Sequence, residues 1–229
     1  MDTSSLFDFS PLVQDFDKII LGFWATVRLT LTSAFFALIL GTVLVAMRVA
    51  PTPVLRWAGT AYVNVVRNTP LTLVLILCAL GLSDTMQLTF SSEPSTNYFW
   101  WAVAGLSAYT ASFVCEALRS GINTVAVGQA EAARAIGLTF TQSLRLVVLP
   151  QAFRTVIAPL GSILIALTKN TTIVTVASYL DAAAQMKQMF DDFGGTIPIF
   201  LGFAIGYMVL TLPTGFFFGW LAKRLAVAR

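Results

Sequence analysis

The sequence predicts an all-α integral membrane protein with five membrane-spanning helices in a single domain, residues 1–229. Hydrophobic residues make up 57% of the 229 positions and charged residues only 11%, whereas a soluble domain carries about 25% charged residues. Five apolar stretches each have the roughly 20 residues that a helix needs to cross a bilayer. They run over about 21–47, 57–82, 98–118, 152–180 and 197–221.

The first stretch carries polar residues near its end, whereas the second carries them in its interior. In the first, Trp24 suits the membrane interface, and Arg28 lies near the same end, where a long side chain can reach the headgroups. The second is interrupted by Arg67-Asn68-Thr69-Pro70. Pro70 removes a backbone donor and is expected to kink the helix, with Asn68 and Thr69 forming hydrogen bonds at the kink. The run therefore either shapes the helix, with Arg67 reaching inward to the interface, or lines a substrate path.

The third stretch begins with Trp100 and Trp101 and ends with two charges three residues apart, Glu116 and Arg119. Side chains at this spacing face each other on a helix, so an ion pair that stabilises the span is expected. The two cysteines, Cys78 and Cys115, both lie in apolar stretches. They are expected to pack as small apolar side chains rather than form a disulfide or a metal site.

The connection over residues 128–150 is polar, although apolar stretches flank it. Residues 130–135 are good helix formers, and Gly137 is a suitable residue to end that helix. Thr139 and Gln142 have the spacing of a capping box, which begins a second helix, and Pro150 marks a further interruption. The pattern predicts two short helices that meet at a glycine turn outside the hydrocarbon.

The fourth stretch is apolar as far as Leu167 and then meets the run Lys169-Asn170-Thr171-Thr172. A charge near the bilayer centre costs about 2.5–3.5 kcal/mol on insertion scales. Four consecutive polar side chains cannot share one helix face, so the helix is expected to break or tighten beside a cavity. Lys169 then either lines a substrate path or pairs with a protein acid or carbonyl.

The fifth stretch contains two glycine pairs with the spacing that permits close helix packing, Gly202-x3-Gly206 and Gly215-x3-Gly219. Phe216–Phe218 is expected to face lipid.

Charge predicts the orientation of the five spans. Segments 1–18, 83–97 and 181–195 hold nine acids and two bases, whereas the rest of the chain holds twelve bases and two acids. Basic loops stay in the cytoplasm. The N-terminus is therefore expected outside, and the C-terminus and the 128–150 connection inside. The acidic first residues lack the basic start of a secretory signal, so the first span is expected to be retained.

Several kinds of catalysis are excluded by composition. The chain has no His, no Gly-x4-Gly-Lys-Ser/Thr and no Gly-x-Ser-x-Gly motif. It is therefore neither a His-dependent enzyme nor a P-loop ATPase by itself, and no catalytic residues or metal ligands are expected.

The 128–150 connection resembles the EAA loop of ABC importer permeases of type I. The resemblance is carried by Glu131-Ala132-Ala133, by Gly137 six residues after Glu131, and by Val147-x-Leu149-Pro150. It implies a coupling helix that docks onto a cytoplasmic ATP-binding subunit. The complex would hold two such subunits, which bind ATP and Mg, while this chain binds no cofactor. The implied coupling residues are Gln129, Ala130, Glu131, Ala132, Ala133, Arg134 and Gly137.

Three further runs resemble permeases for polar amino acids, in particular those of glutamate and glutamine uptake. They are Arg67–Leu71, Glu116-x-x-Arg119-x-Gly121-Ile122 and Leu167–Thr172. Asn68 departs from the glycine that is usual in the first run. The resemblance implies a second permease chain, as a heterodimer or homodimer, and an extracellular binding protein in a multi-pass plasma-membrane complex. The substrate-path residues would be Arg67, Asn68, Thr69, Lys169, Asn170, Thr171 and Thr172.

Two cations near the path, Lys169 and Arg67, favour an acidic or zwitterionic substrate, because a carboxylate would offset their desolvation. Two alternatives remain. One is an ABC permease for another solute, such as a peptide or an inorganic anion. The other is a passive channel or scaffold subunit, in which the loop only holds a partner.

Overall fold

The computed structural model describes residues 8–194 and 197–225, and all regular structure within them is helical. Two short π-helical segments, Leu77–Thr85 and Leu144–Val148, and one 3-10 segment, Thr171–Ala177, join the α-helices. The α-helices are α1 Ser10–Gln14, α2 Phe16–Val49, α3 Pro53–Arg67, α4 Leu71–Ile76, α5 Pro94–Asn123, α6 Val127–Ala135, α7 Phe140–Ser143, α8 Leu149–Asn170, α9 Ala182–Phe193 and α10 Ile197–Leu225.

Four helical stretches are long and apolar enough to cross a membrane, and a bent pair, α3 with α4 and its π segment, makes a fifth. The single crossings are Phe16–Val49, Pro94–Asn123, Arg145–Ala177 and Ile197–Leu225. The all-α fold with up to five spans agrees with the prediction. Each crossing begins earlier or ends later than its apolar stretch, because polar residues continue the helices beyond the hydrocarbon.

Helix α5 is the centre of the bundle. In its most apolar window 61% of the residues are buried, against 22% in the corresponding windows of α8 and α10. The main core is formed where α2, α4 and α5 meet the end of α8, and it includes the fully buried Leu29, Leu75, Leu106 and Leu167. The exposed side chains of α10 are mostly large and apolar, as expected for a lipid-facing helix.

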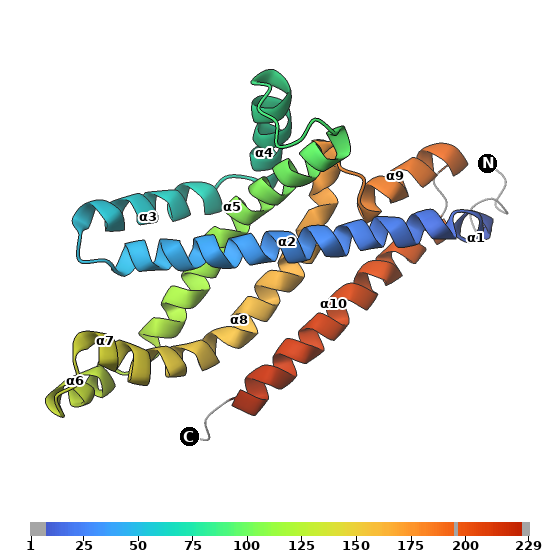
Figure 1. The fold of residues 1–229 in the computed structure, drawn as a ribbon. Coiled ribbons are helices and arrows are strands. Elements are labelled where there is room, and N and C mark those ends of the chain that lie inside the picture. Colours follow the sequence, from blue (N-terminus) through green and yellow to red (C-terminus); the bar gives the residue numbers. More distant parts are fainter. Residues whose placement is uncertain (1–7, 195–196, 226–229) are drawn as a thin grey trace.

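The two ends of the bundle carry different structures (Figure 1). Helices α6 and α7, the turn between α2 and α3, and the C-terminal end of α10 lie at one end, which we call the loop end. Helices α1 and α9 and the start of α10 lie at the other end, which we call the α9 end. Residues 8–18 and 181–194 therefore lie at the end opposite to the 128–150 connection (Figure 1).

The second crossing is broken rather than kinked: α3 and the helix after it are bent by 104°. The amide of Thr69 donates to the carbonyl of Val66 at 3.2 Å, and Pro70 has no donor to continue the helix. The Asn68 and Thr69 side chains donate to the carbonyls of Asn64 and Val65, at 2.7 and 2.9 Å. The expected hydrogen bonds are present, and together they end α3 completely.

The start of α8 corrects a second expectation. Pro150 does not interrupt the chain, because it lies in the first turn of α8, where its missing amide needs no partner. The π-helical segment Leu144–Val148 runs directly into α8.

Of the glycine pairs in α10, the first packs as expected. In the second, only Gly215 has a neighbour, since a Cβ there would lie 3.4 Å from Ile165 of α8. A Cβ on Gly206 would lie 2.1 Å from the ring of Phe23, and one on Gly202 would lie 2.8 Å from Leu12. Gly219 has no atom within 4 Å. Phe216 and Phe217 are exposed, but Phe218 packs on Gly161 of α8, so the expectation that all three phenylalanines face lipid was wrong for Phe218.

Candidate coupling loop and translocation site

The polar connection forms the two short helices that its sequence predicts. Helix α6 ends in a Schellman motif: Leu138 donates its amide to the carbonyl of Ala133 at 3.1 Å, and Gly137 donates to Arg134 at 3.0 Å. Gly137 has φ +94°, a conformation that side-chain-bearing residues rarely adopt. The glycine is therefore required by the turn itself.

The second helix begins with the expected capping box. The amide of Thr139 donates to Gln142 Oε1 at 2.9 Å, and the amide of Gln142 donates to Thr139 Oγ1 at 3.3 Å. The loop is further tied to the start of α8, because Gln151 donates its side-chain amide to Gln129. These bonds fix the angle between α6 and the helix that follows it.

The coupling residues named from the sequence divide into an outer and an inner set. Gln129, Glu131, Ala132, Arg134 and Gly137 are exposed at the loop end, whereas Ala130 is half-buried and Ala133 is 5% exposed. The two inner alanines lie on the side of α6 that faces α7. The carbonyl of Ala130 accepts a hydrogen bond from the hydroxyl of the buried Ser143 of α7 at 3.5 Å. The exposed face offers one acid and one base to a partner surface.

The run after Leu167 tightens the helix, as the sequence predicts. Helix α8 ends at Asn170 and continues as the 3-10 segment Thr171–Ala177. The hydroxyls of Thr171 and Thr172 donate to the carbonyls of Thr168 and Lys169, at 2.9 and 2.8 Å. The hydroxyls thus satisfy carbonyls that the change of helix type would otherwise leave without donors.

The four residues of this run point to different surroundings. Asn170 lines a cavity of about 240 Å³ together with Tyr109, Thr110, Phe113 and Ser162, side chains from α5 and α8. Lys169 and Thr172 are exposed, and Thr171 is completely buried. Lys169 makes no ion pair with any residue that the structure describes. Asn170 is therefore the member of the run that contributes to the cavity.

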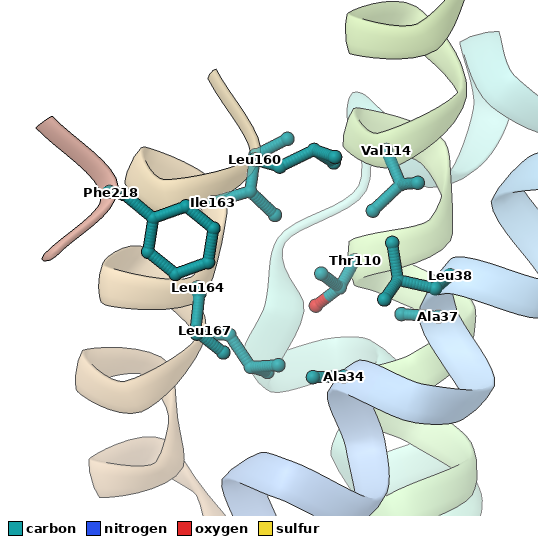
Figure 2. Close-up of a pocket in the computed structure, with 10 residues that line it drawn as sticks. All are labelled: Ala34, Ala37, Leu38, Thr110, Val114, Leu160, Ile163, Leu164, Leu167 and Phe218. Carbon is teal, nitrogen blue, oxygen red and sulfur yellow. The ribbon is translucent and has the colours of Figure 1, made fainter. Parts of the chain in front are cut away.

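A second cavity, of about 120 Å³, adjoins the first and shares Thr110, Ile163 and Leu167 with it. Figure 2 shows its walls from α2, α5, α8 and α10, with the Thr110 hydroxyl among aliphatic side chains and the Phe218 ring. This lining can receive apolar atoms but offers no charge. The Asn170 cavity is the more polar of the two.

The other polar run, at the break of the second crossing, contains a shared ion pair. Glu116 Oε1 is bound by Arg48 of α2 and lies 3.9 Å from Arg67 Nη1 of α3. The prediction that Glu116 pairs with Arg119 was wrong, because the long side chain of Arg48 reaches the Glu116 carboxylate from another helix. The side chain of Arg67 is 44% exposed. The exposed Asn68 and the half-buried Thr69 bond back to their own helix through their side chains.

The fold brings the two polar runs together. Helix α4, which follows the break at Pro70, packs on the 3-10 segment that follows Asn170. Leu71 and Leu75 of α4 share one apolar cluster with Leu167 and Val174. Each broken helix therefore supports the other.

Two cations with defined partners were not identified as site residues from the sequence. One is Arg48, whose side chain is 7% exposed. The other is Arg28, which donates to the hydroxyl of Tyr179 at 3.3 Å and has its guanidinium 4.6 Å from the ring centre of Phe99. Their partners lie at least 67 residues away in the chain, so no local spacing could reveal them.

Comparisons with known proteins agree with each other. The family described as binding-protein-dependent transport system inner membrane component matches residues 19–227. The chain is 49% identical over 214 residues to the glutamate transport system permease protein GluC of Corynebacterium efficiens, covering 91% of this chain and 94% of that protein. It is 33% identical over 225 residues to the probable glutamine ABC transporter permease protein GlnM of Bacillus subtilis, covering 98% of both. The crystal structure of an amino acid ABC transporter with histidines matches with a TM-score of 0.86 at 26% identity, covering 95% of this chain and 98% of that one.

Proposed function

Because the chain belongs to the family of binding-protein-dependent transport system inner membrane components, the permeases of ABC importers, we propose that it forms half of a translocation path for glutamate or glutamine. Its relatives named for glutamate and glutamine transport cover nearly the whole chain. The chain itself is a translocation subunit.

The observation that carries the choice of substrate is the placement of two exposed cations at the two helix breaks. Arg67 and Lys169 are both exposed, and Asn170, which follows Lys169 in the chain, lines the cavity of about 240 Å³. A carboxylate ligand would offset the cost of holding these cations within the membrane. Asn170 would hydrogen-bond to the ligand, and an amide side chain serves glutamate and glutamine alike.

The proposal includes the partners that such a permease needs. A second permease chain, identical or different, would complete the path, and an extracellular binding protein would deliver the amino acid. Two cytoplasmic ATP-binding subunits would hold ATP and Mg, and one of them would dock on the exposed face of α6, around Glu131 and Arg134. The loop end would then face the cytoplasm, and the α9 end the outside of the plasma membrane.

The experiment that tests the substrate assignment is Lys169→Met in the full complex, which keeps most of the side-chain length and removes the charge. Uptake per folded complex is measured for acidic, neutral and basic amino acids. We expect unchanged complex abundance and a fall in glutamate uptake of about tenfold, corresponding to one lost charge-assisted contact of about 1.4 kcal/mol. Lys187→Met, which removes an exposed lysine of α9, is the matched control.

Other results would contradict the proposal in distinct ways. Unaltered glutamate uptake by Lys169→Met would remove this lysine from the path. A strong loss of complex abundance would show that Lys169 serves structure. Equal flux with and without ATP in reconstituted vesicles would indicate a passive channel, and ATPase activity stimulated only by another solute would indicate a different substrate.

A further inference from the structure

A buried acid lies at the α9 end of the bundle and has no role in the proposed substrate path. Asp181 caps the start of α9, and its Oδ1 accepts the amide of Ala184 at 3.0 Å. The residue is 0% exposed. Its second oxygen, Oδ2, is buried and has no hydrogen-bond partner among the residues that the structure describes.

The side chains around Asp181 come from three other elements. Thr26 of α2 and Thr171 of the 3-10 segment are both 0% exposed. Thr26 Oγ1 accepts the amide of Ala182 at 3.1 Å, and the Thr171 hydroxyl donates to the carbonyl of Thr168 at 2.9 Å. The hydroxyl of Tyr207 on α10 is close enough to feel the Asp181 charge, and it too is buried and lacks a partner within the described residues.

No described cation neutralises this acid. The ion pairs in the described part of the chain involve Asp15 and Glu116 but not Asp181. Two tyrosines are the titratable groups that face Asp181: Tyr207 on α10, and Tyr179, two residues before Asp181 in the chain. Arg28 of α2 donates to the hydroxyl of Tyr179. The other charged residues of α9 are exposed and point elsewhere: Lys187, Asp191 and Asp192.

Burial without a cation favours the neutral form of a carboxyl group. It raises the pKa of Asp181 from 3.8 to about 6, although backbone amides at the start of α9 oppose the shift. A group whose pKa is raised by packing binds its proton more tightly in the packed arrangement than in water. The packed arrangement is therefore strengthened by acid, and it loses this contribution as the pH rises from about 4 through about 6.

We propose that Asp181 is a proton-binding site that fastens α9 to α2, α10 and the 3-10 segment. When α9 is packed, the carboxyl carries a proton and no charge is buried. When the proton is released, a charge is buried without a cation beside it, and this favours arrangements in which α9 has moved away from α2 and α10 and water reaches the carboxylate. Protons on this side of the membrane would thereby regulate opening at the α9 end, a property beyond amino-acid translocation itself.

The test compares the full complex with an Asp181→Asn variant in nanodiscs. Asparagine keeps the oxygen that accepts the amide of Ala184 and remains a good N-cap, but it cannot ionise. Hydrogen exchange of the α9 amides, corrected for intrinsic exchange, is measured between about pH 5 and about pH 8. For the wild type, the pKa shift predicts that protection falls about tenfold over this range. The Asn variant should show no such fall.

Asp192→Asn is the matched control, since it removes an exposed acid from the same helix and should keep the wild-type pH dependence. Constant protection of α9 in the wild type would overturn the proposal without reference to any variant. An equal fall in wild type and Asp181→Asn would also overturn it. A further outcome would reject the proton assignment. If sodium but not choline protected the α9 amides at high pH in the wild type, and this protection were lost in Asp181→Asn, the site would bind a metal cation rather than a proton.

Discussion

Glu116 holds three helices together with one carboxylate. It lies on α5 and binds Arg48 at the end of α2, while Arg67 at the end of α3 lies 3.9 Å away. Arg48 is nearly buried, with 7% of its side chain exposed. A buried cation that loses its partner is strongly unfavourable, whereas an exposed one is hardly affected. The stability of the loop end should therefore depend strongly on Glu116, the one acid of α5.

The substitution Glu116→Gln tests this dependence. We expect it to lower the free energy of unfolding by about 3 kcal/mol, because Arg48 would keep its buried charge without a carboxylate. Arg119→Gln, at the position that local spacing suggested as the partner, should change it by less than about 0.5 kcal/mol. Thermal unfolding of the purified complex measures both, and equal effects of the two variants would contradict the observed pairing.

The Glu116 pair also shows what local sequence patterns can reveal about single residues. Gly137, Thr139 and Gln142 were identified correctly, because a helix end and a capping box are decided within four residues. The partner of Glu116 was not, since Arg48 lies 68 residues away and reaches it only after α2 and α5 cross. The buried Asp181 gave no signal either, because its sequence neighbours do not show that three other elements cover it.

At the scale of elements, the polar loop is the part whose geometry follows most directly from its residues. Its turn requires the positive φ of Gly137, and no atom lies within 4 Å of the position where a Cβ would be. A substitution there acts through the backbone conformation and not through a clash. The orientation of α6, and with it the proposed docking face, depends on this one turn.

We therefore expect Gly137→Asp to weaken coupling in the assembled transporter. The strained backbone costs about 1 kcal/mol, and the new charge would enter the proposed contact with the ATP-binding subunit. Retention of that subunit and uptake in membranes are the measurements. Gly128→Ala is the control, since this glycine also has open space around it but lies in α6 without a positive φ. Normal uptake with Gly137→Asp would reject the coupling role.

Elements that depend on tertiary packing were predicted less completely. Pro70 indicated a disturbance in the second crossing, but its bend of 104° requires α4 to find its place against the 3-10 segment. The tightening after Asn170 was expected, because four polar residues in a row cannot be placed on one lipid-facing helix. The prediction for Pro150 was wrong, because the sequence alone does not show whether a proline follows the end of one helix or lies in the first turn of the next.

For the whole molecule, the charge difference between the two ends gives a testable orientation. The loop end carries Arg48, Arg134, Arg145, Lys223 and Arg224, whereas the α9 end carries Asp181, Asp191 and Asp192. Basic segments stay in the cytoplasm. The N-terminal charges that supported the same prediction lie partly outside the described residues, so the test is placed within α9 and at the end of α5.

Single cysteines at Gln188 and Asn123, both exposed in the structure, should report this orientation with an impermeant thiol reagent. The background is Cys78→Ser with Cys115→Ala. We expect Gln188→Cys to react in intact cells, and Asn123→Cys to react only after the membrane is opened. Reaction of Asn123→Cys from outside would invert the orientation and remove the loop from the reach of a cytoplasmic ATPase.

The broken second crossing has a consequence for how the chain is synthesised into the bilayer. Its two halves, Pro53–Arg67 and Leu71–Thr85, have 15 residues each. Each half spans about 22 Å as a helix, less than the hydrocarbon thickness of about 30 Å. Neither half is long enough to be inserted as a membrane span by itself. Leu71 and Leu75 of the second half also pack on helices that are synthesised later. We expect the nascent chain to settle this crossing last, after α5 and α8 have left the ribosome.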